Sequence, residues 1–125
     1  MDIGEKLYVS SREAWRAWLA ANHQDRSDIW LVIYKKGSGK EGVLLREAMD
    51  EALCFGWIDS QLKSIDAESY ALRFTPRRKK SVWTPINKGR VLEMLREGLV
   101  TPAGIAVLPP DVLAAWEQEK ETGAP

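Results

Sequence analysis

The run Ile-Trp-Leu-Val-Ile-Tyr-Lys at Ile29–Lys35 is the feature that most limits how this chain can fold. It is rich in β-branched and aromatic residues, and both of its alternating faces are apolar. A strand with two apolar faces suits the middle of a sheet, where neighbours and covering helices keep it from water. The remaining segments must therefore supply partner strands and the helices that cover them.

Two further strands are predicted at Trp57–Ile65 and Ser69–Thr75, joined through a short polar turn. In the second strand, large apolar residues alternate with small or polar ones, which is the period of a half-buried strand. Because of this alternation, we expect the side chain of Arg73 to point away from the core. Pro76 ends the strand, because proline has no N–H to donate to a neighbouring strand.

Five helices are predicted from apolar residues at helical spacing, over Arg12–Ala21, Leu45–Phe55, Lys88–Glu97, Pro102–Leu108 and Asp111–Lys120. Their expected N-terminal caps are Ser10, Asn87, Thr101 and Asp111, with one extra turn at Ser81–Trp83. Gly56 is placed to end the second helix in a left-handed conformation. The order of elements predicts an α+β fold: a small, mostly antiparallel three-stranded sheet packed against several helices.

The chain has 125 residues, a length that predicts a single domain over residues 1–125, ending in a short C-terminal helix and tail over 109–125. No apolar run approaches the ~20 residues of a membrane-spanning helix, and the N-terminus lacks the pattern of a signal peptide. Cys54 is the single cysteine, which fits a reducing compartment, so we expect a cytoplasmic protein. In the last turn of its helix, Cys54 is expected to be a buried thiol and not a nucleophile.

Positive charge is concentrated in one window, although the formal net charge is zero. Residues 69–92 hold seven cations and no acidic residue. Such a window attracts anions locally whatever the total charge. We therefore expect a ligand-binding site made of aromatic, cationic and small polar side chains, namely Trp57, Asp59, Arg73, Arg77, Arg78, Ser81, Trp83 and Asn87.

Each of these residues also has a purely structural interpretation. For Asp59 we favour a salt bridge to Arg73 or Arg77 over a role as an acid or base. Acid–base catalysis would need a second carboxylate or base, and none lies nearby in the sequence. Trp57 and Trp83 suit stacking on a ligand and packing in the core equally well. The arginine pair can hold a carboxylate or phosphate in bidentate fashion, or belong to a solvated loop. We assign no catalytic residue, metal or cofactor.

Several motifs, in order, resemble a family of bacterial proteins called YdeI, OmpD-associated or bacteriocin-protection proteins. They are Trp30–Lys36 with Gly37-Ser-Gly39, the segment from Glu47-Ala48 through Ala52-Leu-Cys-Phe-Gly-Trp-Ile-Asp59, Arg73-Phe-Thr-Pro-Arg-Arg78, Ser81-x-Trp83-x-x-Ile-Asn87, and Thr101-Pro-Ala-Gly104. The resemblance covers about residues 7–106. It implies a cytoplasmic protein of envelope-stress or cationic-peptide resistance, with a C-terminus that is short for that family.

Three functions stay open at this point. The first is a binding module for an anionic small molecule, a lipid headgroup or an acidic protein segment, held by the basic-aromatic loop. The second is a single-stranded nucleic-acid binder, in which cations follow phosphates and a tryptophan stacks on a base. The third is a small enzyme with Asp59 as acid or base. We favour the first, since a site without paired titratable groups makes a poor active site.

Overall fold

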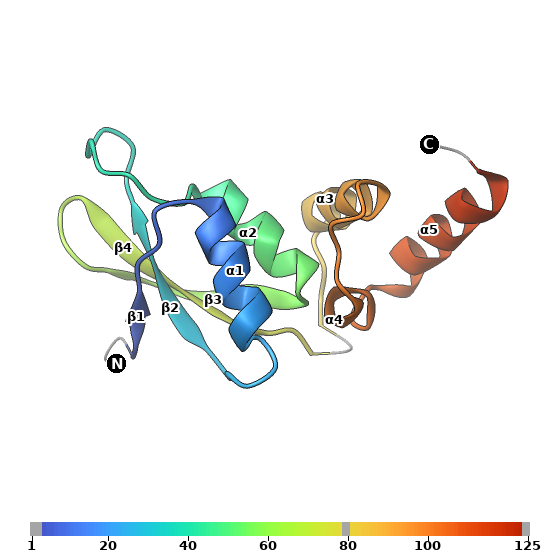
Figure 1. Cartoon of the computed structure of the whole chain (residues 1–125), viewed down its shortest axis with the longest axis horizontal. Helices are drawn as coiled ribbons and strands as arrows, with labels where there is room; N and C mark the ends of the chain where they lie inside the picture. Colours follow the sequence, from blue (N-terminus) through green and yellow to red (C-terminus); the bar gives the residue numbers. More distant parts are fainter. Residues whose placement is uncertain (1–3, 79–80, 124–125) are drawn as a thin grey trace.

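The computed structural model describes residues 4–78 and 81–123, which form a four-stranded sheet and five helices (Figure 1). In chain order the elements are β1 (Lys6–Leu7), α1 (Arg12–Asn22), β2 (Ile29–Tyr34), α2 (Leu45–Cys54), β3 (Trp57–Ser64), β4 (Ser69–Pro76), α3 (Pro85–Arg96), α4 (Pro102–Ile105) and α5 (Pro110–Thr122). The predicted α+β class is confirmed.

The sheet has the strand order β1-β2-β4-β3, so β2 lies inside it as its two apolar faces predict. β2 pairs antiparallel with β4, and β4 pairs antiparallel with β3. The expected count of three strands is wrong, because β1 adds a fourth strand parallel to β2. β1 is only two residues long, and a pair of residues is too short to show any alternation in the sequence.

β3 is an edge strand with an irregularity near its start. Its pairing with β4 is regular up to Asp59, shifts by one residue at Ser60, and continues from Gln61. A bulge of this kind leaves one residue unpaired and bends the strand. Both Asp59, before the bulge, and Leu62, after it, therefore pair with residues of the same face of β4.

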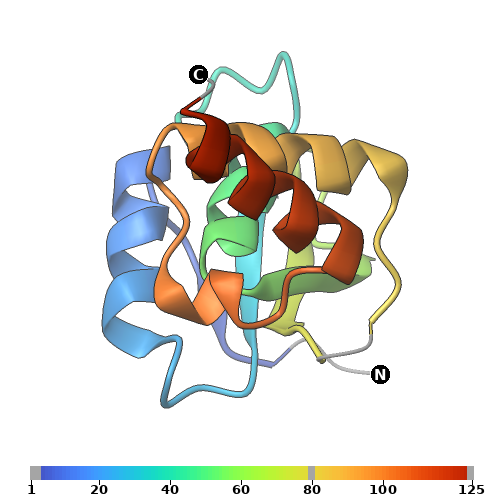
Figure 2. The same cartoon turned by 90° about the vertical axis from the view of Figure 1, so that its right-hand side faces the viewer.

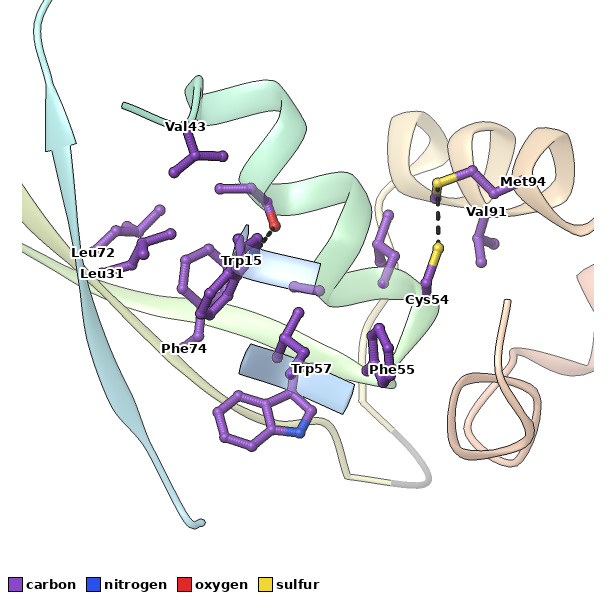
Figure 3. Packing of buried hydrophobic residues seen from close by; sticks show 14 of the residues in the cluster. Trp15, Leu31, Val43, Cys54, Phe55, Trp57, Leu72, Phe74, Val91 and Met94 are labelled. Carbon is purple, nitrogen blue, oxygen red and sulfur yellow. Dashed lines mark hydrogen bonds between the residues drawn. The ribbon is translucent and has the colours of Figure 1, made fainter. Parts of the chain in front are cut away.

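The helices α1 and α2 cover one face of the sheet (Figure 1). Phe74 of β4 marks this face, because its ring lies 5.2 Å from that of Trp15 on α1. Trp15 is fully buried, and its indole Nε1 donates a hydrogen bond of 3.0 Å to the carbonyl of Ala48 on α2 (Figure 3). One side chain thus joins the sheet and both helices at the centre of the core.

The remaining helices, α3, α4 and α5, lie beyond one end of the sheet in Figure 1 and face the viewer in Figure 2. α3 packs against α2, where the Sγ of Cys54 lies 3.6 Å from the Sδ of Met94 (Figure 3). Cys54 is fully buried as predicted, and burial raises the pKa of its thiol to about 11. α4 is held to the end of α2 by Thr101, whose hydroxyl donates to the carbonyl of Cys54 at 2.7 Å.

Several helix starts differ from the sequence prediction. α1 is capped by Ser11, not Ser10, and α3 is capped by Thr84, not Asn87. α5 begins at Pro110, so Asp111 is inside the helix. In α3 and α5 a proline takes the first helical position, where its fixed φ and missing N–H fit the helix start.

Two shorter segments also differ from the prediction. α4 ends at Ile105, short of the expected Leu108, and Ser81–Trp83 is not helical. Gly56 follows α2 with a φ of 73°, which confirms its expected left-handed conformation. In the described part of the chain, no helix is long and apolar enough to cross a membrane.

The contact between α4 and α2 predicts that Gly104 tolerates no side chain. A Cβ at this position would lie 2.5 Å from the carbonyl oxygen of Cys54 and 2.8 Å from Cγ1 of Val100. We expect Gly104→Ala to lower the free energy of unfolding by about 1–3 kcal/mol, measured by urea denaturation. Gly89→Ala is the matched control, because nothing lies within 4 Å of its Cβ and it is inside α3. It should stabilise the protein by about 0.5–1 kcal/mol; equal effects of the two variants would contradict this packing.

Candidate functional site

Arg77 follows the last residue of β4 and turns its side chain into the protein. Its backbone N–H donates to the carbonyl of Gly56 at 2.7 Å, and the residue is only 5% exposed. The guanidinium lies over the indole of Trp83, with 3.9 Å between its Cζ and the ring centroid. Nη1 donates to the hydroxyl of Ser81 at 2.9 Å and to the carbonyl of Val82 at 3.1 Å. These contacts fix the guanidinium in one orientation.

The opposite edge of the same guanidinium makes no hydrogen bond. Nε and Nη2 of Arg77 are both buried and lack a partner among the residues that the structure describes. Burial lowers the pKa of Arg77 to about 10, although the negative charge of Asp59 acts in the other direction. Arg77 therefore remains charged at neutral pH, with two donor nitrogens that make no hydrogen bond to a described residue. An unmade buried hydrogen bond costs about 1–3 kcal/mol, which makes this edge the least satisfied part of the described core.

A small cavity lies where Arg77 meets β3 and the first turn of α3. Its polar lining consists of Asp59, Arg77 and Asn87, and its apolar lining consists of Met49, Ala52, Leu53, Trp57, Ile58 and Phe74. The volume is about 10 Å³, which is close to the space needed by one water molecule. The cavity can thus admit a single oxygen atom of a ligand beside the guanidinium, but not a whole organic molecule.

The structure brings together five of the eight predicted site residues around this guanidinium: Asp59, Arg77, Ser81, Trp83 and Asn87. Trp57 also lines the cavity but is only 1% exposed, and its ring packs edge-on against Trp18 at 6.1 Å. Of the two alternatives left open for Trp57, the structure shows core packing. Asn87 is free to line the cavity because Thr84 has taken the capping position.

Arg73 and Arg78 lie apart from this arrangement. Arg73 is on the face of β4 opposite Phe74, as its alternation predicts, and its Nε donates to Asp28 at 2.9 Å. The salt bridge expected from Asp59 is not formed, since Asp59 makes no ion pair with any described arginine. Arg78 is exposed. Lys79 and Lys80, the other cations of the loop, lie outside the described residues.

Two buried carboxylates on α2 were not identified by the sequence analysis. Asp50 and Glu51 are 2% and 5% exposed. Glu51 accepts from Arg12 and Arg16 of α1, each with an ion pair of 2.8 Å. Asp50 pairs with Arg46 of its own helix and with Arg90 of α3. The four arginines were visible in the sequence, but their convergence depends on how three helices pack.

These ion pairs border a second cavity, of about 420 Å³, between α1, α2 and α3. Asp50 and Glu51 are both paired, so neither is free to take up a ligand. Among the described residues, no group of three or more His, Cys, Asp or Glu is arranged to hold a metal ion. The carboxylate pair therefore has a structural role, and the unsatisfied edge of Arg77 remains the better candidate for a ligand site.

A family model described as "Domain of unknown function (DUF8412)" matches residues 7–107. The match includes Asp59, Arg77 and Asn87, and it reaches from β1 to the residues just after α4. No curated protein and no solved structure matches the chain. The description names no activity, so the function has to be argued from the chemistry of the site.

The unmade hydrogen bonds predict that Arg77 contributes little to stability. We expect Arg77→Met to change the free energy of unfolding by less than about 1 kcal/mol, because it removes a poorly satisfied buried charge together with its stacking on Trp83. Arg16→Met is the control and should cost about 2 kcal/mol, since Glu51 stays buried with one cation fewer. Urea denaturation of both variants measures the difference. A loss at Arg77 as large as that at Arg16 would show that Arg77 is a structural residue.

Proposed function

The chain belongs to the DUF8412 family of domains of unknown function, and on that premise we propose that it is a binding module for small anionic groups. The observation that supports this proposal is the free edge of Arg77. Its Nε and Nη2 form a fork of two N–H donors, which can both donate to one oxygen of a carboxylate or phosphate. No other described side chain combines a buried cation with two unpaired donors.

The fork is held in place before a ligand arrives. Ser81, Val82 and Trp83 fix the guanidinium through two hydrogen bonds and one stacking contact. A preorganised donor pair loses little conformational entropy on binding, so more of its interaction energy appears as affinity. Since the guanidinium is already desolvated, an anion does not have to displace its water shell. A stable, fixed and unsatisfied donor pair is what a selective anion site requires.

The walls of the cavity limit the kind of anion. The space of about 10 Å³ admits one oxygen, so the rest of the ligand must remain outside. Asn87 lines the same space and can donate an amide N–H to the same oxygen. Asp59 repels a second full negative charge but can accept a proton donor. We therefore favour a carboxylate, or a phosphate that keeps one proton, carried by a small molecule or by an acidic protein segment.

The two other functions have less support from this geometry. A single-strand binder needs exposed aromatic faces for the bases, whereas Trp57 and Trp83 are both buried, and Arg77 already covers one face of Trp83. An enzyme would need a second titratable group beside Asp59, and the cavity lining supplies only Arg77 and Asn87 as further polar groups. Anion binding needs nothing beyond the residues that are present.

The biological setting of the proposal comes from the resemblance to YdeI and OmpD-associated proteins. On that basis we place the module in the cytoplasm, in the response to envelope stress or to bacteriocins and cationic peptides. The ligand would then be an anionic metabolite or the acidic segment of a partner protein. This setting is independent of the chemistry proposed for Arg77.

Anion binding can be tested with simple salts. Sodium acetate and sodium phosphate are titrated into the protein at constant ionic strength, with sodium chloride as the reference, while tryptophan fluorescence and the ¹H–¹⁵N signal of Arg77 Nε are recorded. We expect a saturable change with acetate or phosphate, because the anion hydrogen-bonds to Nε and alters the charge above Trp83.

Two variants make this test specific. Arg77→Met should abolish the saturable change, whereas Arg78→Ala, which removes the exposed neighbouring cation, should leave it intact. Equal responses of wild type and Arg77→Met, or a response lost in Arg78→Ala, would contradict the proposal. Tight binding of an oligo(dT) at low salt, with affinity falling steeply as salt is added, would favour the nucleic-acid alternative instead.

A further inference from the structure

A larger hollow lies at the end of β2, away from the Arg77 site. It occupies about 470 Å³, within the range of about 300–1,000 Å³ that is typical of small-molecule pockets. Three parts of the chain line it: the C-terminal end of β2 with the residues just after it, the start of α2, and the start of β4. The lining residues are Ile33, Tyr34, Lys35, Lys36, Leu44, Leu45, Arg46 and Tyr70. We call it the β2–α2 pocket. None of these residues lines the cavity beside Arg77.

The floor of the β2–α2 pocket is apolar. Ile33 and Tyr70 are paired across β2 and β4, on the same face of the sheet as Phe74. Leu44 and Leu45 stand opposite at the start of α2 and are 61% and 42% exposed. A helix N-cap is normally a residue with a side-chain oxygen, yet Leu44 takes this position. Two exposed leucines at a helix start add nothing to the core, so their apolar surface is available to a ligand.

The rim of the β2–α2 pocket is positively charged. Lys35, Lys36 and Arg46 contribute to the lining, and no acidic residue does. Neither lysine forms an ion pair with a residue that the structure describes, whereas Arg46 is fixed by Asp50, with 3.1 Å between Nη2 and Oδ1. The N-terminal end of α2 adds the positive end of its helix dipole. Positive potential therefore surrounds an apolar surface.

We propose that the β2–α2 pocket binds an amphipathic anion, that is, a small molecule with an apolar body and one negatively charged head group. The body lies against Leu44, Leu45 and Tyr70, and the head group lies near the two lysines. A neutral apolar ligand would leave the cations unused, and a cationic amphiphile would be repelled by them. This site does not depend on the function proposed for Arg77.

Three probes of matched chemistry test the class of ligand, each used below its micelle concentration. Dodecanoate has the tail and the negative head, dodecyltrimethylammonium has the same tail with a positive head, and acetate has the head alone. Binding is measured by calorimetry and by displacement of 8-anilinonaphthalene-1-sulfonate. We expect dodecanoate to bind saturably with a ratio of one per chain, at least about tenfold more tightly than either of the other two.

Exposed residues of the β2–α2 pocket supply variants that should leave the fold intact, checked by thermal unfolding. Leu44→Gln should weaken dodecanoate binding about tenfold through lost apolar contact, and Lys36→Glu about fivefold through charge reversal at the rim. Ile86→Gln is the matched control, since Ile86 is also largely exposed but lies in the first turn of α3. It should bind dodecanoate like the wild type.

The opposite results would overturn the proposal. Equal affinity for dodecanoate and dodecyltrimethylammonium would show a hydrophobic surface without charge selection. An equal loss in Ile86→Gln and Leu44→Gln would show that detergent binds without a site. A mass that doubles with protein concentration, and returns to that of one chain in Leu44→Gln, would show that the leucines contact a second copy of the chain instead.

Discussion

The packing of α1 and α3 against α2 depends on two carboxylates that α2 holds inside the protein. Glu51 draws two arginines of α1 onto α2, and Asp50 draws Arg90 of α3 onto the same helix. Buried carboxylates are tolerated only when paired, so the three helices can assemble in few other arrangements. Because α3 is fixed in this way, its first turn comes to lie beside the end of β4. The position of Asn87 in the cavity wall thus follows from the ion pair of Arg90, which lies about one turn further along α3.

The candidate site differs from this network in how its charge is satisfied. Arg90 and Arg16 face carboxylates, whereas Arg77 is buried with a ring below it, two acceptors on one side and no acceptor on the other. Natural proteins depart from full hydrogen-bond satisfaction mostly where function requires it. Arg77 thus differs from the well-paired arginines of the same domain. This difference is the main reason to regard Arg77 as a binding residue.

Local patterns predicted most of the fold, and the site only in part. The apolar run of β2 and the alternation around Phe74 predicted the two inner strands, β2 and β4, because side-chain period depends only on neighbours in sequence. Thr84-Pro85 carries the same cap-and-proline signal as Thr101-Pro102, but Asn87 offered a competing cap and concealed it. Arg73 pairs with Asp28, and the buried Asp50 pairs with Arg90; in both pairs the residues are far apart in sequence. Such contacts depend on tertiary packing, which a single sequence does not reveal.

The bulge at Ser60 has a consequence for the behaviour of the protein in concentrated solution. β3 is the outer strand of the sheet, and an outer strand that is long and flat offers its unpaired N–H and C=O groups to other chains. The extra residue bends this strand and interrupts the even spacing of those groups. Lys63, with its charge on the same strand, adds a further obstacle to the approach of another chain. The bulge thus makes this edge a poorer template for pairing with a strand of another chain.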